Sequence, residues 1–276
     1  GQREGLVCAL CPDSYAVNKE QGDCQKCEGG MTFLVVVSPI LIIMVIFGMY
    51  YAGNDHLTVN ASISLTTTVS LGIIVCSFQV LSVFRLLSVP WPAKFSPLLD
   101  AMSVLNLNPD VVTLECTMGT DATILYLLRI LVPIVLVALL FLTYGFVNVV
   151  AVLLPIQRWV FDKVLNTVGQ VFQTLFIPFA VIAVRPFECF PHPNKESSMM
   201  LFPHVLCGSS VHTPLVILSI FFALVVLLPF VAVCIVANIR APYLSSTSNS
   251  IDGANRFLMR FRFLLYRFRP DMWWWG

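Results

Sequence analysis

Five long stretches of this chain carry no charged residue, and they constrain its fold more than any other feature. An α-helix crosses about 30 Å of hydrocarbon with about 20 apolar residues. Inside a bilayer each span must satisfy its own backbone hydrogen bonds, so each span is helical. The stretches of this length are residues 31–52, 64–84, 130–156, 164–184 and 214–236. The sequence therefore predicts an all-α multi-pass transmembrane helical bundle with five spans within residues 31–240.

Composition supports a membrane location for the chain. Of its 276 residues, 58% are hydrophobic and 11% are charged, whereas about 25% of residues are charged in a soluble domain. The net charge of +1 offers no basic field for nucleic acid, so we expect no nucleic-acid partner. Prolines at positions 39, 133, 178 and 229 fall inside the spans and predict kinks.

Lysine and arginine near the span ends predict the orientation, because they favour the cytosolic side. With the N-terminus outside, the inner segments 53–63, 157–163 and 237–276 hold eight basic residues, and the outer loops 85–129 and 185–213 hold five. We therefore expect an integral protein of the plasma membrane with an extracellular N-terminus. A glycosylation sequon at Asn60 falls on the inner side; such short motifs recur by chance, and we discount it.

Residues 1–30 form a cysteine-rich head in this topology. Its cysteines follow the pattern C-x2-C, twelve residues, C-x2-C, and are Cys8, Cys11, Cys24 and Cys27. The spacing suits either a zinc site or a disulfide module. Because cysteines in an extracellular segment pair with one another, disulfides are favoured over zinc, and free thiols are the third alternative.

Three more cysteines lie in the outer loops. We expect a bridge between Cys189 and Cys207, with Cys116 as a rival partner for either. The histidines of the same loop, His192, His204 and His212, leave a metal cluster as an alternative, but our expectation is that the chain has no metal and no cofactor.

Polar residues recur along one face of two spans. They are Thr66, Ser70 and Ser77 in the second span, and Asn166, Gln170 and Gln173 in the fourth. Such residues join helices by hydrogen bonds or line an aqueous path. Joining helices is the favoured interpretation and a conduction path is the alternative. Arg129, near the outer end of the third span, is interpreted as a snorkelling anchor.

Residues 241–276 are predicted to be a cytosolic tether, a basic amphipathic helix and the approach to a further span. Helical spacing places Phe257, Phe261, Leu264 and Phe268 on one arc. We expect five arginines to contact anionic lipid headgroups: Arg256, Arg260, Arg262, Arg267 and Arg269. The alternative is a helix packed on a protein partner. The final tryptophans are typical of a membrane interface, so we interpret the sequence as a piece of a longer protein.

Three segments resemble a known group of proteins. "CALCPDSYAVNKEQGDCQKCEGG" resembles the ephrin-receptor-like, EGF-like cysteine repeat. "SFQVLSVFRLLSVPWPAKFSPLLDAMSVLNLNPDVVTLEC" and "FRFLLYRFRPDMWWWG" resemble segments that flank spans in large protist surface proteins. Those proteins carry tandem cysteine repeats before a membrane region likened to transient-receptor-potential and polycystin-like channels. The resemblance implies the last cysteine repeat and five of a larger number of spans.

The sequence predicts a receptor-like or sensor-like surface protein, with a cation channel formed together with further spans as one form of that function. A transporter or channel that uses the polar faces of spans two and four is the alternative. No phosphate loop, nucleophile elbow or H-E-x-x-H motif occurs, so an enzyme is not expected and no catalytic residue is assigned. Candidate partners are the lipid bilayer, an extracellular ligand and further copies of the chain.

Overall fold

The computed structural model describes residues 11, 15–17, 24–26, 30–54, 61–84, 92, 121–246 and 251–265. In chain order, the first elements are β1 (Tyr15–Val17), β2 (Cys24–Lys26), α1 (Gly30–Asn54), α2 (Ala61–Phe84), α5 (Ala122–Leu153), α6 (Phe161–Thr174) and α7 (Phe176–Val184). A 3-10 turn, η4 (Arg185–Phe187), leads to β3 (Cys189–Pro191) and β4 (Ser197–Met199). The remainder is α8 (His212–Phe222), the π-helical segment η5 (Ala223–Leu227), α9 (Leu228–Ser246), α10 (Ile251–Arg260) and α11 (Arg262–Leu265).

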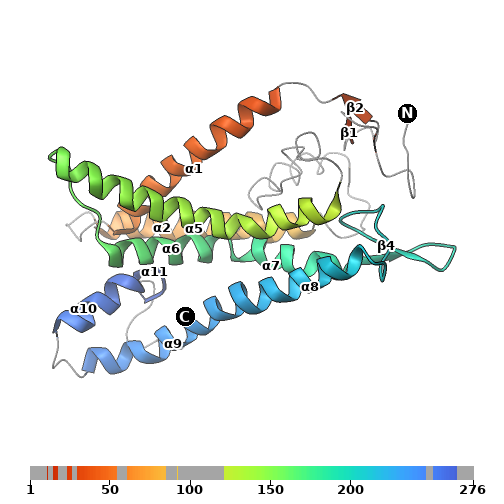
Figure 1. Ribbon diagram of the computed structural model, residues 1–276. Helices are drawn as coiled ribbons and strands as arrows, with labels where there is room; N and C mark the ends of the chain where they lie inside the picture. Colours follow the sequence, from red (N-terminus) through yellow and green to blue (C-terminus); the bar gives the residue numbers. More distant parts are fainter. Residues whose placement is uncertain are drawn as a thin grey trace.

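The helices run lengthwise in an elongated bundle (Figure 1). Helix α6 contacts α1 and α5, and α7 contacts α8 and α2. The two hairpins, β1–β2 and β3–β4, lie at one end of the bundle, whereas α10 and α11 lie at the other end (Figure 1). We call residues 185–212 the cap. The clasp comprises residues 50–54, 158–169 and 257–265, at the end opposite the cap.

Two continuous helical runs are long and apolar enough to cross a membrane: α5, and the run from His212 to Tyr243. The pair α6 and α7 makes a third if it is one broken span, and shorter apolar helices lie at Ile40–Tyr51 and Gly72–Leu81 within the part of the chain described. Helices thus occupy all five predicted ranges. These findings support an integral membrane protein, and the number of five spans stays a prediction.

The bends of the bundle lie near two of the four prolines. Helices α6 and α7 meet at 54°, around Leu175 and three residues before Pro178, which has no N–H to offer the carbonyl of Thr174. Pro229 lies two residues after the end of the π-helical segment, whose wider turn relieves the clash of a proline ring with the preceding turn. Helices α1 and α5 continue through Pro39 and Pro133 without interruption.

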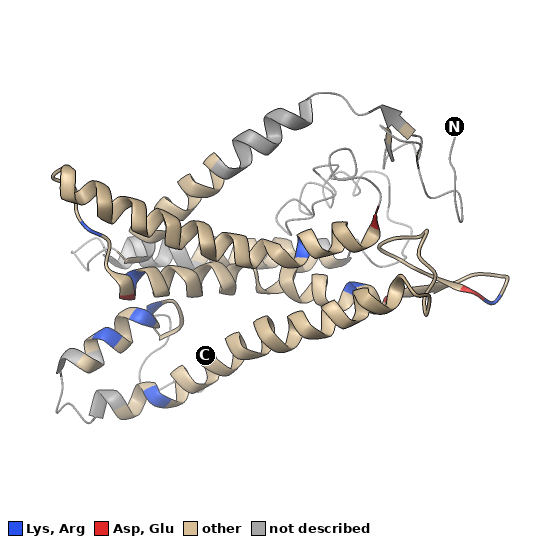
Figure 2. Cartoon of the chain, in the orientation of Figure 1, with Lys and Arg blue, Asp and Glu red and all other residues tan. Residues whose placement is uncertain are grey.

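Among the residues that the structure describes, charged residues lie toward the two ends of the bundle and leave a charge-free middle (Figure 2). Within 121–265, the cap end holds three basic and three acidic residues: Arg129, Arg185, Lys195, Asp121, Glu188 and Glu196. The described side chains of the clasp end include six basic residues and one acidic residue: Arg158, Lys163, Arg240, Arg256, Arg260, Arg262 and Asp162. A middle without charge and a basic excess at one end are typical of a protein that spans a bilayer.

The buried apolar residues form separate clusters toward the two ends. The cluster at the cap end includes Tyr126, Phe179, Phe202, Leu215 and Phe222. The cluster at the clasp end comprises Ile46, Tyr50, Leu140, Val147, Trp159 and Val164. A small third cluster joins Ala237 of α9 to Phe263 and Leu264 of α11. Each end of the bundle therefore has a core of its own.

Candidate functional site: a disulfide-closed cap and a polar clasp

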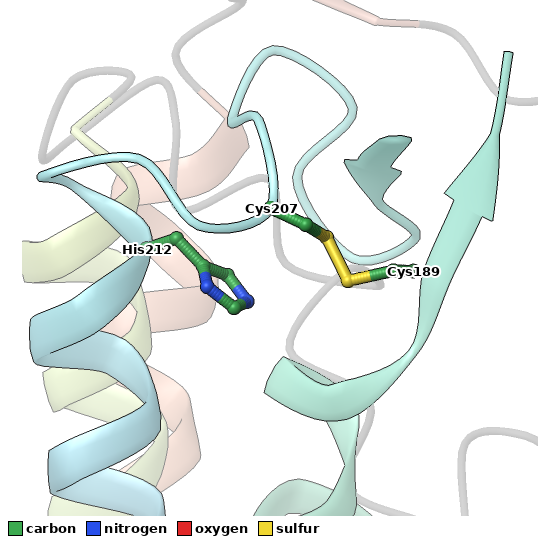
Figure 3. A group of neighbouring side chains, drawn as sticks. All are labelled: Cys189, Cys207 and His212. Carbon is green, nitrogen blue, oxygen red and sulfur yellow. A yellow bond between two sulfur atoms is a disulfide. The ribbon is translucent and has the colours of Figure 1, made fainter. Parts of the chain in front are cut away.

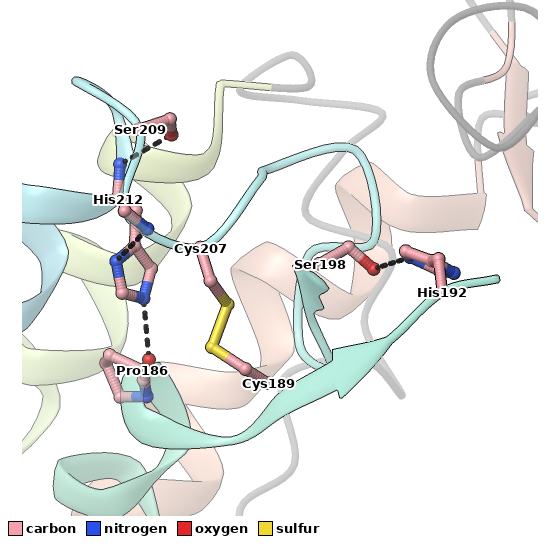
Figure 4. Close-up of a disulfide and its surroundings, with 8 residues drawn as sticks. Pro186, Cys189, His192, Ser198, Cys207, Ser209 and His212 are labelled. Carbon is pink, nitrogen blue, oxygen red and sulfur yellow. Dashed lines mark hydrogen bonds between the residues drawn. A yellow bond between two sulfur atoms is a disulfide. The ribbon is translucent and has the colours of Figure 1, made fainter. Parts of the chain in front are cut away.

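The cap is a short hairpin closed by a disulfide. Strand β3 pairs antiparallel with β4, with Phe190 opposite Ser198, and Lys195 adopts a left-handed φ of 69° in the turn between them. Ser198 also pairs with Leu206 on the other side of β4. Cys189 is bonded to Cys207 (Figure 4), which is the pairing favoured from the sequence. The bridge ties the hairpin to the segment that enters α8.

His212 lies beside this disulfide and is already engaged at both ring nitrogens. Its Nδ1 accepts from the Gly208 N–H at 3.1 Å, and its Nε2 lies 2.9 Å from the Pro186 carbonyl oxygen (Figure 4). Because Nδ1 is an acceptor, the proton lies on Nε2. Figure 3 shows the ring facing the disulfide, and the ligand atoms of Cys189, Cys207 and His212 all lie within 4.8 Å of one another. Since both sulfurs and both nitrogens are in use, this trio is a structural link.

The cap rests on the first turns of α5. The guanidinium of Arg129 lies over the Phe202 ring, 5.3 Å from its centroid, and Phe202 is buried. Next to the cap, the Tyr126 hydroxyl of α5 donates to the Ile182 carbonyl of α7 at 3.1 Å, and the Ser219 hydroxyl of α8 donates to the Ala183 carbonyl of α7. Arg129, interpreted from the sequence as a snorkelling anchor, therefore also makes a cation–π contact with the cap.

One histidine of the cap is perturbed by burial. Burial lowers the pKa of His204 below its ordinary value of 6.5, and the nearby Asp121 carboxylate acts in the opposite direction. His204 therefore favours its neutral form in the folded cap.

At the clasp, aromatic residues pack the end of α1 against the loop between α5 and α6. The Trp159 ring stacks on Tyr50 with centroids 3.9 Å apart and planes at 9°. The Tyr50 hydroxyl accepts from the Val160 backbone N–H at 3.1 Å. The backbone N–H of Trp159 donates to Asn148 Oδ1 at 3.0 Å. Trp159 is 4% exposed. This contact joins residues more than 100 positions apart in the sequence.

A series of side-chain amides continues the clasp inward. Asn54 Nδ2 donates to the Tyr50 carbonyl at 2.8 Å and to Thr167 Oγ1 at 3.2 Å. Asn166 Nδ2 donates to Asn54 Oδ1 at 3.0 Å. The Phe263 N–H in turn donates to Asn166 Oδ1 at 2.7 Å. Asn54, Asn166 and Thr167 are buried, so these bonds form where water does not compete for them.

Helix α11 and the end of α10 close the clasp from the outside. Phe263 lies so near Gly169 of α6 that any Cβ at position 169 would overlap its ring. Arg260 forms an ion pair with Asp162 in the first turn of α6. Phe263 and Leu264 are buried. The basic amphipathic segment thus packs on this chain's own helices α6 and α9, whereas contacts with headgroups or with a protein partner stay predictions.

The two predicted polar faces, on α2 and α6, differ in how far their side chains are buried. Asn166 is buried and joins three helices through its amide, as expected of a residue that joins helices. Gln170 and Gln173 are half-buried, and within the described part of the chain Gln173 Oε1 is buried without a hydrogen-bond partner. On α2, Ser70 and Ser77 are exposed, and the side chain of Thr66 lies outside what the structure describes. Whether any of these residues lines a path stays a prediction.

The predicted cysteines and arginines are described in part. Cys11 is bonded to Cys24 beside the β1–β2 hairpin, whereas Cys8, Cys27 and Cys116 lie outside the described residues. Arg256 and Arg260 are exposed and Arg262 is half-buried; Arg267 and Arg269 also lie outside. Headgroup contacts by these arginines stay a prediction.

Sequence reasoning missed most of the clasp. Tyr50, Asn54, Trp159 and Gly169 were not singled out, nor was the buried Gln79 of α2. Asn54 and Trp159 did carry a signal, since each stands just beyond the end of an apolar stretch. Gly169 carried none, because its role depends on a ring that follows 94 residues later.

Comparison with protein-family models, with curated proteins and with solved structures found no match to this chain. What the described residues offer at these two sites is mechanical. They link helices and fix a hairpin.

Proposed function

We propose that this chain belongs to a multi-pass membrane protein that couples its extracellular cysteine-rich head to the basic C-terminal helix, as a receptor or sensor does. One observation carries the proposal. Helix α1 begins at Gly30, four residues after β2 ends, and continues without a break to Asn54, whose amide is part of the clasp. A single helix therefore joins the head to the site where α11 is held.

The length of α1 suits this role. Its 25 residues, at about 1.5 Å each, span about 37 Å, which exceeds the hydrocarbon thickness of a bilayer. A helix moves as a rigid rod over such a length, so a tilt or shift at its head end displaces Asn54. Coupling between distant sites requires an element whose position both sites bias, and α1 meets this requirement.

Charge supports the orientation that we propose, with the head and cap outside. The clasp end has a net excess of basic residues within 121–265, whereas the cap end is balanced. Basic residues favour the cytosolic side, and the two described disulfides, Cys11–Cys24 and Cys189–Cys207, belong to the opposite end. We extend the proposal to the plasma membrane, to anionic headgroups around α10, and to an extracellular ligand and further copies of the chain as partners.

Hydrogen exchange of the full chain in phospholipid nanodiscs tests this coupling. Replacing Cys11 and Cys24 with serine loosens the head, and the proposal expects faster exchange in α10–α11 as well as in the head. Replacing Cys76 and Cys234, which are free thiols, is the matched control and should leave both regions unchanged. Faster exchange confined to the head would overturn the proposal.

A channel or transporter is the second candidate, and the broken pair α6 and α7 favours it. Broken helices with polar groups near the break are used by transport proteins, and Gln170 and Gln173 lie within the last turns before the break at Leu175. Ion flux into liposomes that contain the full chain should fall when both glutamines are changed to leucine. An absence of flux, or flux that the double variant leaves unchanged, would contradict this candidate.

A further inference from the structure

We propose that α10–α11, here called the latch, is a releasable element seated on α6, and that Asn166 makes its release depend on the position of α1. The inference deepens the proposed function and rests on it for the idea that the head moves α1. The seat is the surface of α6 around Gly169, on which Phe263 lies. The junction is the hydrogen-bonded group formed by the Asn54 side chain, the Asn166 side chain and the Phe263 N–H, at the clasp.

The polarity of the junction makes Asn166 a shared element. Its Oδ1 accepts from the Phe263 N–H at 2.7 Å, which fixes the amide in one of its two orientations because a flipped amide would oppose two donors. The fixed amide directs Nδ2 at Asn54 Oδ1, 3.0 Å away. One planar group thus holds α11 with one atom and α1 with the other.

The seat of the latch requires glycine at position 169. Gly169 lies under the Phe263 ring, in space that a Cβ would fill. Phe263 also stacks on Phe230 of α9, with ring centroids 6.4 Å apart and planes at 20°. Arg260 adds the ion pair with Asp162, which lies about one helical turn before Asn166 in α6.

Few of the described side chains of the latch are fully buried, which is why it can release. Its buried residues within the described part are Phe263 and Leu264. The Arg260 side chain remains 44% exposed in its ion pair, so water and salt weaken that pair. On α10, Leu258 is 47% exposed.

Movement of α1 would act on the latch through the junction. If Asn54 withdraws, the bond from Asn166 Nδ2 to Asn54 Oδ1 is lost in a buried site, where the loss of a hydrogen bond is costly. The amide then gains by rotating or shifting toward another acceptor, and in doing so it abandons the Phe263 N–H. The latch therefore closes when α1 is in the position seen here and loosens when α1 moves.

The experiment uses Asn54→Ala, which removes the α1 side of the junction and touches no residue of the latch. Hydrogen exchange of the full chain in nanodiscs should show the peptide that contains Phe263 exchanging about tenfold faster. Asn148→Ala is the matched control, since Asn148 also binds a backbone N–H at the clasp but lies outside the junction. The Phe263 peptide should exchange at the wild-type rate in this control. A wild-type rate in Asn54→Ala, or an equal increase in both variants, would overturn the inference.

A reciprocal experiment starts from the latch, because coupling between two sites acts equally in both directions. Gly169→Ala should displace Phe263, release the latch and raise exchange at the end of α1, around residues 50–54. Gly145→Ala is the matched control, since nothing lies within 4 Å of a Cβ at that position. If Gly169→Ala releases the latch and leaves α1 unchanged, the junction does not couple them.

These results are separable from the test of the proposed function. If the head acts on the latch by another route, the exchange of α10–α11 rises when Cys11 and Cys24 are replaced, but the Phe263 peptide of Asn54→Ala exchanges at the wild-type rate. The opposite outcome would show a junction that works but is not driven by the head.

Discussion

The cap and the clasp hold the two ends of the bundle by different means. The cap closes on itself: its disulfide joins residues 18 positions apart, and its hairpin and His212 bind neighbours within residues 185–212. The clasp joins three segments by stacked rings and buried amides, through contacts between residues more than 90 positions apart. The cap is therefore fixed by local covalent structure, whereas the contacts of the clasp depend on the relative positions of α1, α6 and α11.

The largest effect is expected from Trp159→Ala at the clasp. Removing a buried aromatic side chain costs about 3–5 kcal/mol, and here it also removes the ring stacked on Tyr50. Thermal unfolding in nanodiscs should show a lower midpoint, and exchange at the end of α1 should rise. Trp159→Phe keeps a ring in the stack and should lose less. A midpoint equal to that of wild type would mean that the clasp does not hold the bundle.

Removal of the cap disulfide should have the next largest effect, and it should stay local. Changing Cys189 and Cys207 to serine frees a loop of 18 positions, worth about 3 kcal/mol in the chain-entropy account. Limited proteolysis after Lys195 should be faster, while exchange in α10–α11 stays at the wild-type rate. Faster exchange in α10–α11 would erase the contrast between the two ends.

A smaller effect is expected from Arg260→Ala. Its ion pair with Asp162 is 44% exposed on the arginine side, and exposed pairs contribute less than about 1 kcal/mol. Exchange of α10 should rise modestly at low salt, and the difference from wild type should shrink as salt is added. Arg256→Ala, one turn earlier and exposed, is the control for the loss of one positive charge. Equal effects of the two variants would show that net charge, and not the pair, holds α10.

The smallest effect is a pH dependence confined to the cap. Because burial lowers the pKa of His204 in the folded state, the neutral ring is favoured there. The resulting stability is fully present above the unfolded pKa of about 6.5 and is lost as the pH falls through the lower, folded value. Proteolysis after Lys195 should therefore speed up in mild acid, less so in His204→Gln. A cap that becomes more resistant in mild acid would contradict this sign.

Sequence reasoning captured what local patterns encode. Charge-free stretches located the helices, because a span needs only length and apolarity. The break near Pro178 and the π-helical segment before Pro229 follow from proline chemistry. The Cys189–Cys207 pair was favoured because both cysteines fall in one outer loop, whereas the rival partner Cys116 falls in the other.

The clasp could not be predicted in the same way. The role of Gly169 depends on Phe263, and the role of Asn54 depends on Asn166, 112 positions away. Helical periodicity gave the apolar arc of Phe257, Phe261 and Leu264 but not what covers it, and the structure places α6 and α9 there. Ser70 and Ser77 lie on the predicted polar face of α2 yet are exposed, whereas Gln79, which the prediction did not include, is buried.

The most direct test of the account measures which side of the membrane each end faces. Short epitope tags are inserted in the full chain, one at the hairpin turn beside Lys195 and one beside Gly253 on α10, and antibodies are applied to intact and to permeabilised cells. We predict that the cap tag binds antibody in intact cells and that the α10 tag does so only after permeabilisation. Binding of both tags from the same side would contradict a bundle that carries the cap and the clasp on opposite faces of a bilayer.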